Sequence, residues 1–360
     1  MKKFALYLPQ FHRVPENDKW WGEGFTEWTN VKKAMPLYQN HVQPKLPLNF
    51  NYYDLDKVET LEWQVNLAKK YNIDGFIFYH YYFCGKKLLY KPAEMLLKNK
   101  DIDMKFFFCW ANHSWYRSWE GSKELLINQS YGDRRDWEKH FHYLLQFFKD
   151  DRYEKKDNKP IIMLFKSDFT EKIEMMDYFN ILCQKNGFDG IYVIETYEDY
   201  NRKHIKQFEN QSYQRNIFLR EPASSTKDFL ENNVKYRINN KIKKVSSTIL
   251  NSRYLTKFSG NELFKRMIYN NFKESNIYRG LFFEWDNTPR HGIRGYVITP
   301  VDKELFMKYM DSIKENEYVF INAWNEWCEG MMLEPTEQNG YKYLQWIKEW
   351  SSNENRINGV

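Results

Sequence analysis

Short apolar runs alternate along the chain with longer stretches in which apolar residues recur at every third or fourth position. Residues 59–71 and 136–150 are two such stretches, and their spacing predicts amphipathic helices. The apolar runs occupy Phe4–Leu8, Gly75–Tyr79, Lys105–Trp110, Pro160–Phe165, Gly190–Glu195, Gly280–Trp285 and Tyr318–Ala323. Such runs between helices are typical of βα units whose parallel sheet is covered on both faces.

An eighth strand fits at Asn216–Arg220, and eight βα units predict an α/β fold of the (β/α)8 TIM-barrel type. The alternative is an open doubly wound sheet, but no GxGxxG motif follows the first strand. Two insertions are expected, at residues 13–50 after strand 1 and at residues 223–278 between strands 6 and 7. We expect a single catalytic domain over residues 1–352 and a C-terminal tail over residues 353–360.

The second insertion contains the most basic part of the chain, RINNKIKKVSS at residues 237–247. A solvated helix face and a partner-binding patch are the two interpretations of this segment. The net charge of the whole chain is +6, with no dense basic stripe and no RNA-binding signature, which argues against nucleic acid as a partner.

Composition narrows the class of protein. Hydrophobic residues make up 42% and charged residues 28%, as in soluble globular proteins, and aromatic residues reach 19%. An excess of Trp and Tyr is expected where rings stack on sugars, and an aromatic-rich core is the alternative. The apolar run at the N-terminus ends at Pro9, too early for a signal peptide, and no apolar stretch approaches membrane-spanning length, so we predict a cytoplasmic protein.

Metal and cofactor chemistry is not expected. The four cysteines, Cys84, Cys109, Cys183 and Cys328, form no CxxC pair and are interpreted as reduced structural thiols. No HxH or HExxH spacing indicates a metal, and no GxSxG motif indicates a serine nucleophile.

In a parallel barrel, ligands bind at the C-terminal ends of the strands and in the loops that follow. These positions hold aromatic, amide, carboxylate and histidine side chains, which stack on pyranose faces and pair with hydroxyl groups. We therefore predict an oligosaccharide or polysaccharide substrate. Its predicted binding residues are Tyr7, Gln10, His12, Glu27, Trp28, Tyr79, His80, Trp110, Asn112, Trp115, Trp119, Glu195, Trp285, Asp286, Asn287, Arg290, Trp324, Asn325 and Glu334.

Glu326 and Glu329 lie three residues apart just after the last strand. Glycosidic bond chemistry needs one carboxyl group as an acid and a second, ionised one as a base or nucleophile. Burial beside tryptophan and a neighbouring negative charge would raise the pKa of one of them. The alternative is that these glutamates bond backbone amides or form an ion pair with Arg290.

Five motifs in order resemble the glycoside hydrolase family 99-like group, also named after the WbsX-type glycosyltransferases of polysaccharide gene clusters. They are YLPQFHRVPENDKWWGEGFTEWTNV, GFIFYHYYFCGKKLL, WANHSWYRSWEG, EWDNTPR and NAWNEWCEG, and the resemblance spans Lys3 to Trp350. It implies a barrel that acts on glycosidic bonds. The third motif departs from the usual WANENWTRRWDG, with His113 and Ser114 in place of Glu and Asn, and Glu120 in place of Asp.

The resemblance to the related endo-α-mannosidases also implies roles for the two glutamates. Glu326 would take the proton from the sugar's 2-hydroxyl, which attacks the anomeric carbon. Glu329 would act first as the acid and then as the base for water or another acceptor, with net retention.

We therefore expect an enzyme that cleaves or transfers glycosidic bonds in cell-surface polysaccharide metabolism, such as that of O-antigen or capsule, with peripheral association with membrane-bound glycan intermediates. The alternatives are a glycosyltransferase that uses an activated sugar donor, a non-catalytic glycan-binding barrel and an amidase.

Overall fold

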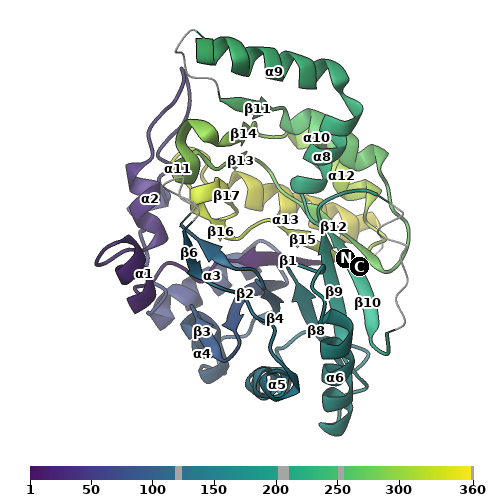
Figure 1. The fold of residues 1–360 in the computed structure, drawn as a ribbon. Helices are drawn as coiled ribbons and strands as arrows, with labels where there is room; N and C mark the ends of the chain where they lie inside the picture. Colours follow the sequence, from purple (N-terminus) through teal and green to yellow (C-terminus); the bar gives the residue numbers. More distant parts are fainter. Residues whose placement is uncertain (118–123, 202–210, 250–254, 358–360) are drawn as a thin grey trace.

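The computed structural model describes residues 1–117, 124–201, 211–249 and 255–357. Within them, parallel strands close into a barrel (Figure 1), and the last strand pairs with the first. Around the barrel the strands are β1 (Lys2–Tyr7), β2 (Gly75–Phe83), β4 (Lys105–Trp110), β8 (Lys159–Leu164), β9 (Tyr192–Tyr197), β10 (Gln214–Leu219), β12 (Ile277–Leu281) and β15 (Tyr318–Ile321). The predicted (β/α)8 barrel, including its eighth strand, is confirmed.

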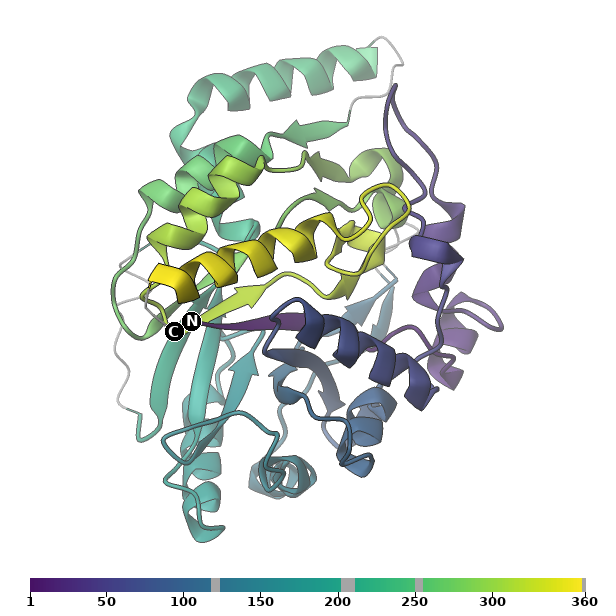
Figure 2. The same ribbon diagram turned by 180° about the vertical axis from the view of Figure 1, so that it is seen from behind.

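Helices surround the barrel, and Figure 2 shows them from behind. They are α3 (Val58–Lys70), α4 (Lys91–Lys98), α5 (Arg134–Phe148), α6 (Lys172–Lys185), α8 (Ala223–Asn232), α10 (Gly260–Tyr269), α12 (Lys303–Ser312) and α13 (Lys342–Ile357). The end of α13 lies beside the N-terminus in both views. The predicted helices at residues 59–71 and 136–150 correspond to α3 and α5.

The loops at the C-terminal ends of the strands carry short elements of their own. The first insertion contains α1 (Pro15–Trp21), α2 (Glu27–Lys33) and the 3₁₀ helix η1 (Leu48–Phe50), and the second contains α9 (Val234–Ile249) and β11 (Thr256–Phe258). The remaining short elements are β3 (Lys86–Leu88), β5 (Trp115–Tyr116), β6 (Leu125–Ile127), β7 (Lys155–Lys156), β13 (Trp285–Asp286), α11 (Thr288–His291), η2 (Gly292–Arg294), β14 (Tyr296–Ile298), β16 (Asn325–Glu326), η3 (Trp327–Glu329) and β17 (Met331–Met332).

Aromatic rings fill much of the barrel interior. Phe320 lies between Phe107 and Phe218, with ring centroids 5.9 and 5.1 Å away, and Phe4 lies 5.3 Å from Phe107. Gly75 makes room for Phe4, because a Cβ atom there would lie 2.1 Å from that ring. Part of the aromatic excess therefore belongs to the core.

The seventh strand differs from its prediction. The apolar run at residues 280–285 predicts a strand there, whereas β12 begins at Ile277 and ends at Leu281. Arg279 lies buried within it because its guanidinium donates hydrogen bonds to the carbonyls of Met267 and Asn270. The apolar run continues past the strand because Phe283 packs beyond it, against Tyr343.

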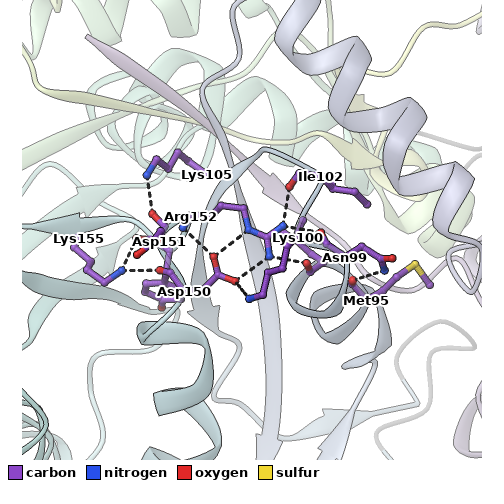
Figure 3. A network of polar contacts seen from close by, with 11 residues as sticks. Met95, Asn99, Lys100, Ile102, Lys105, Asp150, Asp151, Arg152 and Lys155 are labelled. Carbon is purple, nitrogen blue, oxygen red and sulfur yellow. Dashed lines mark hydrogen bonds and ion pairs between the residues drawn. The ribbon is translucent and has the colours of Figure 1, made fainter.

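A buried ionic network braces the turn that follows α5, near the start of β4 (Figure 3). The guanidinium of Arg152 donates two hydrogen bonds to the carboxylate of Asp150, at 3.0 and 2.8 Å. It also donates to the carbonyls of Asn99 and Ile102, which follow α4. Burial opposes the ionisation of Asp150, but hydrogen bonds from Arg152 and Lys100 outweigh it and lower the pKa of this carboxyl. The network ties α4, α5 and β4 together.

Candidate functional site

A cavity of about 360 Å³ opens among the loops at the C-terminal ends of the barrel strands. Its volume lies in the range typical of small-ligand sites, roughly 300–1,000 Å³. Its described lining residues are Leu8, Gln10, Trp21, Tyr79, Tyr81, Ala111, His113, Ser114, Trp115, Tyr116, Leu126, Phe165, Arg220, Arg290, Asn322, Glu326, Glu329 and Met331. Aromatic rings and ionisable groups both contribute to this wall.

A tight hairpin places Glu326 and Glu329 in the cavity wall. β16 and β17 pair antiparallel, and the single turn of η3 joins them. Side chains three residues apart eclipse each other in a 3₁₀ turn, so both glutamates lie on the same side. Gly330 ends the turn in the left-handed conformation, with φ of 60°, which favours glycine.

Arg290 of α11 lies among three carboxylates. Its guanidinium donates to Glu329 at 2.5 Å, to Glu326 at 3.3 Å and to Glu27, at the start of α2, at 3.2 Å. Glu27 is fully buried, whereas the Glu329 side chain is 24% exposed. The guanidinium therefore holds the two predicted catalytic glutamates together, and both still face the cavity. The expected alternative, an ion pair with Arg290, is present alongside that cavity.

The pKa of Glu326 is raised to about 8. Burial is the main cause, the charge of Glu329 adds to it, and Arg290 opposes it. Glu326 is therefore mostly protonated near neutral pH. The prediction that burial and a neighbouring carboxylate raise the pKa of one glutamate agrees with this result.

The wall formed by the ends of β8 and β10 is basic. Arg220 forms an ion pair with Glu198, and Lys166 lies 4.0 Å from the same carboxylate. The Arg220 guanidinium stacks on Phe165, 4.6 Å from the ring centroid. Burial, Lys166 and Arg220 lower the pKa of His113 to about 4, so this imidazole is neutral near pH 7. Two cations share one carboxylate here, which leaves a positive charge facing the cavity.

Aromatic side chains complete the cavity. Trp115 packs edge-on against Tyr81, with 5.0 Å between ring centroids. Burial raises the pKa of Tyr79 and Tyr81 well above that of an ordinary phenol, so both hydroxyls keep their protons and are able to donate hydrogen bonds. Rings beside hydrogen-bonding groups are suited to a sugar.

The predicted site residues fall into three groups. The first lines the cavity: Gln10, Tyr79, Trp115, Arg290, Glu326 and Glu329, with Glu27 adjoining it through Arg290. The second lies behind the cavity wall, packed against the elements that form it: Tyr7, Trp28, Asn112, Trp285, Asp286, Asn287, Trp324, Asn325 and Glu334. The third, His12, His80, Trp110 and Glu195, makes its contacts elsewhere. Trp119 lies outside the described residues.

Glu334 illustrates the second group. Its carboxylate accepts hydrogen bonds from Tyr53, Gln64 and Trp327, each at 2.7 Å. Burial raises its pKa to about 7, although these hydrogen bonds lower it. Because Trp327 belongs to η3, this carboxylate fixes the turn between the two glutamates rather than facing the cavity.

The third group faces away because strand side chains alternate between the two faces of a sheet. Tyr79 and Tyr81 of β2 point into the cavity, while His80 between them bonds His140 of α5 at 2.9 Å. Glu195 is likewise paired outside the cavity, with Lys172 at 3.2 Å and Arg215 at 3.0 Å.

The other two members of this group are also buried. Trp110 donates to the carbonyl of Tyr82, and burial lowers the pKa of His12. Neither of them is among the residues that line the cavity.

Several cavity residues are absent from the predicted set, notably Phe165 and Arg220. Each directly follows a barrel strand, β8 and β10, so the strand-end rule would have selected them had it been applied to strands 4 and 6. The alternation of side chains along β2 that turns His80 away from the cavity also directs Tyr81 into it.

Among the described residues, no three His, Cys, Asp or Glu side chains are grouped as metal ligands would be. No described helix is long and apolar enough to cross a bilayer.

Comparisons with known proteins give a family, two relatives and several similar structures. A sequence model of the family described as Glycosyltransferase WbsX matches residues 3–347. The uncharacterized protein WxcX, from two strains of Xanthomonas campestris pv. campestris, is 30% identical over 353 residues, or 94% of this chain. The alignment covers 48% of WxcX, so the chain spans about half the length of these relatives.

Two structures of the GH99 endo-α-mannosidase from Bacteroides thetaiotaomicron are similar, with TM-scores of 0.58 and 0.57 at 12% identity. These alignments cover 99% of this chain and 98% of that enzyme. A protein described as glycoside hydrolase-like matches with a TM-score of 0.58 at 12% identity, over 97% of this chain and 93% of its own. At such identity the likeness shows the barrel fold alone.

Proposed function

The chain belongs to the WbsX glycosyltransferase family, and we propose that it cleaves or transfers glycosidic bonds with retention, using Glu326 and Glu329 as its catalytic pair. The observation that supports this most directly is the shared cavity: both carboxyl groups and the guanidinium that joins them face one sugar-sized space. Trp115, Tyr79 and Gln10 supply the ring and the polar groups that a pyranose needs.

In the proposed reaction, Glu326 accepts the proton of the sugar's 2-hydroxyl while that oxygen attacks C1. The bond from C1 to the leaving oxygen breaks, and Glu329 gives this oxygen its proton. In the second half, Glu329 takes a proton from water or an acceptor hydroxyl, whose oxygen attacks C1. The C1–O2 bond then breaks, and Glu326 returns its proton to O2. Two inversions at C1 give net retention.

This cycle needs one proton on the glutamate pair and an ionised Glu326 when substrate is bound. The raised pKa of Glu326 supports the single proton, because burial and the charge of Glu329 disfavour two ionised groups at this site. A sugar hydroxyl that donates to Glu326 favours its charged form and leaves the proton for Glu329. Arg290 contacts both groups and stabilises whichever one is ionised.

The test is turnover of an oligosaccharide panel by the wild type, Glu326→Gln and Glu329→Gln, followed by mass spectrometry. We expect each variant to lose at least about 100-fold in kcat, as for removal of a proton-transfer group, with ligand binding retained. Glu304→Gln on α12, whose side chain is 79% exposed, is the matched control and should keep full activity. Unchanged turnover in either variant would refute the catalytic pair, and binding without turnover in the wild type would favour a glycan-binding barrel.

A second candidate is transfer from an activated, phosphate-bearing sugar donor, and the basic wall favours it. Arg220 lines the cavity, and its buried Nε has no hydrogen-bond partner among the described residues. Lys166 lies behind it, 4.0 Å from the carboxylate of Glu198 that Arg220 also pairs with. A phosphate there would have donors that a neutral oligosaccharide does not need. Adding nucleotide sugars to the same panel separates the two candidates: release of the nucleotide only when an acceptor is present supports transfer.

We further propose that the reaction belongs to cell-surface polysaccharide metabolism, of the O-antigen or capsule type, on the cytoplasmic side of the membrane. The motif resemblance supports this assignment, and so does the family description, because assembly of such polymers uses glycosyltransferases. Peripheral association with membrane-bound glycan intermediates follows from the same proposal. Deleting the gene in its native strain should alter the composition of the surface polysaccharide.

A further inference from the structure

Helix α9 turns an apolar stripe away from the body of the protein. Val234, Ile238, Ile242 and Val245 follow one another at spacings of four, four and three residues, which places them on one face of a helix. They are 54%, 54%, 59% and 53% exposed. Four branched apolar side chains aligned on the outside of one helix are unusual, because scattered single exposures are the norm for a soluble surface.

The opposite face of α9 holds the helix on the molecule. Tyr236 packs edge-on against Phe229 of α8, 5.1 Å between centroids, and lies 5.5 Å from Phe258 of β11. Its hydroxyl donates to the carbonyl of Lys257 at 2.6 Å. The helix is therefore docked by one side, and its apolar stripe is not covered by the described part of the chain.

The charges of α9 indicate what covers the stripe. Lys235, Arg237 and Lys241 are exposed beside it, and the helix contains no aspartate or glutamate. An apolar stripe flanked by lysine and arginine is the pattern of a helix that lies in the interface of an anionic bilayer. A second protein copy would bring the same positive charges against these, so charge complementarity favours the lipid surface.

The position of α9 relates this surface to the cavity. Figures 1 and 2 show α9 at the outer edge of the molecule, beyond β11 and β14. Ring contacts lead inward from Tyr236 to Phe258, from Phe258 to Tyr296 at 6.0 Å, and from Tyr296 to Trp285 at 4.5 Å. Trp285 begins the loop that contains Arg290. A bilayer in contact with α9 would therefore lie on the same side of the molecule as this loop, and the loop extends from that side to the cavity.

We propose that α9 is a membrane-docking helix that inserts Val234, Ile238, Ile242 and Val245 among anionic lipids. This surface is separate from the catalytic pair. The proposal rests on the exposure of its apolar side chains and on the charges beside them. It gives the positive segment at residues 237–247 a partner, in place of the solvated helix face considered from the sequence.

The test is cosedimentation of the full chain with phosphatidylglycerol-containing vesicles and with pure phosphatidylcholine vesicles. We expect binding to the anionic vesicles at least about tenfold stronger than to the neutral ones, and weaker again at high salt. The double variant Ile238→Ser, Ile242→Ser should lose at least about tenfold in binding. Ile181→Ser is the matched control, because Ile181 is an isoleucine 44% exposed on another helix, α6, and this variant should bind as the wild type does.

Melting temperatures should match among these proteins, because every substituted side chain is exposed. Equal binding to neutral and anionic vesicles would overturn the charge argument. Absence of vesicle binding, together with a dimer in sedimentation that the double variant loses, would make a second copy the occupant and overturn the proposal. Unchanged glycan turnover in Glu326→Gln or Glu329→Gln, with vesicle binding intact, would refute the catalytic pair and leave this inference standing.

Discussion

Arg290 places one positive charge among the three carboxylates of Glu27, Glu326 and Glu329. Full ionisation of all three would leave two negative charges in a largely buried site, an arrangement that burial disfavours. Protonation of Glu326 removes one of them, which is the physical meaning of its raised pKa. The site thus holds a proton near neutral pH, at the expense of folding stability.

That argument predicts how Glu326→Gln changes stability with pH. An unfolded glutamate ionises near pH 4.3, roughly, whereas the folded Glu326 keeps its proton to higher pH. The stability that the protonated Glu326 contributes is therefore fully present below the unfolded pKa, and it is lost as pH rises through the folded pKa. Glutamine has no such loss. We expect the melting temperature of the variant, relative to the wild type, to increase by about 2 °C or more between about pH 5 and about pH 8.

Calorimetric scans at the two pH values measure this difference. Glu304→Gln is the control, because the pKa of that exposed carboxyl is lowered by its hydrogen bond to Lys308, and its relative melting temperature should not increase with pH. A relative melting temperature of Glu326→Gln that stays level or falls would contradict the raised pKa.

The basic wall gives a second prediction at the scale of single residues. Arg220→Gln removes the guanidinium that faces the cavity but keeps a polar, uncharged side chain. If the wall holds a phosphate, affinity for a nucleotide sugar should fall by about tenfold or more, because a charge-assisted hydrogen bond is lost. Affinity for a neutral oligosaccharide should change far less.

Lys227→Gln is the matched control for this experiment. Lys227 is also paired with a carboxylate, that of Asp199 at 2.9 Å, but it does not line the cavity. Titration calorimetry with both ligand types measures the effect. Equal losses for charged and neutral ligands in Arg220→Gln would assign the arginine to shaping the cavity instead.

At the scale of elements, the hairpin that holds the two glutamates depends on Gly330. An added Cβ would meet the backbone nitrogen and the Cβ of Asp286 at 3.1 Å, in a backbone conformation that side chains rarely adopt. Gly330→Ala should destabilise the fold by about 1–2 kcal/mol and move Glu329 relative to Glu326. We expect kcat to fall more than KM rises, since proton transfer depends on position more strongly than binding does.

Gly340→Ala is the control that separates the effect of backbone strain from the effect of moving Glu329. Gly340 also has a positive φ, 53°, but an added Cβ meets nothing within 4 Å, and Gly340 does not line the cavity. Urea unfolding should show destabilisation in both variants, while turnover should fall only in Gly330→Ala. A Gly330→Ala enzyme with normal kcat would mean that the hairpin tolerates the shift.

The sequence predicts elements better than it predicts the directions of side chains. Periodicity locates all of the barrel strands, because their apolar runs are buried on both faces. It misplaces the bounds of β12, since Phe283 is apolar for packing beyond the strand and Arg279 is buried within it. Neither a tertiary contact of Phe283 nor the carbonyl partners of Arg279 can be read from local pattern.

The same distinction explains the site. Glu326, Glu329, Trp115 and Tyr79 were predictable, because strand ends and motif spacing place them at one rim of the barrel. His80 shows the limit, since its position at a strand end says nothing of its face until the register of β2 is known. Arg290 as a bridge between glutamates required the path of the loop after β13, which no periodicity specifies.

At the scale of the whole molecule, charged groups serve different purposes at two separate places. At the cavity, Glu326 and Glu329 share one cation with a third carboxylate, so the arrangement disfavours full ionisation and lowers stability. In the turn after α5, Asp150 has two cationic partners, Lys100 and Arg152, and the carboxylate is held ionised (Figure 3). Removing a carboxylate charge at the cavity should therefore raise stability near neutral pH, whereas removing a cation from the turn after α5 should lower it.

Arg152→Met tests the structural half of this division. The side chains of Arg152 and Asp150 are only 10% and 3% exposed. Removing the guanidinium therefore takes one of two cationic partners from a buried carboxylate and leaves the carbonyls of Leu96, Asn99 and Ile102 without this donor. Breaking a buried pair in this way should lower the free energy of unfolding by about 3–5 kcal/mol, measured by urea titration at neutral pH. This loss of stability should shrink as pH falls below about 4, because a carboxyl with a lowered pKa contributes stability above its unfolded pKa and loses it on protonation.

Arg135→Met, on the exposed surface of α5, is the matched control, and its free energy of unfolding should change little. At a temperature where Arg152→Met remains folded, its kcat should equal that of the wild type, and a reduced kcat would show that the network near the start of β4 also positions the glutamate pair.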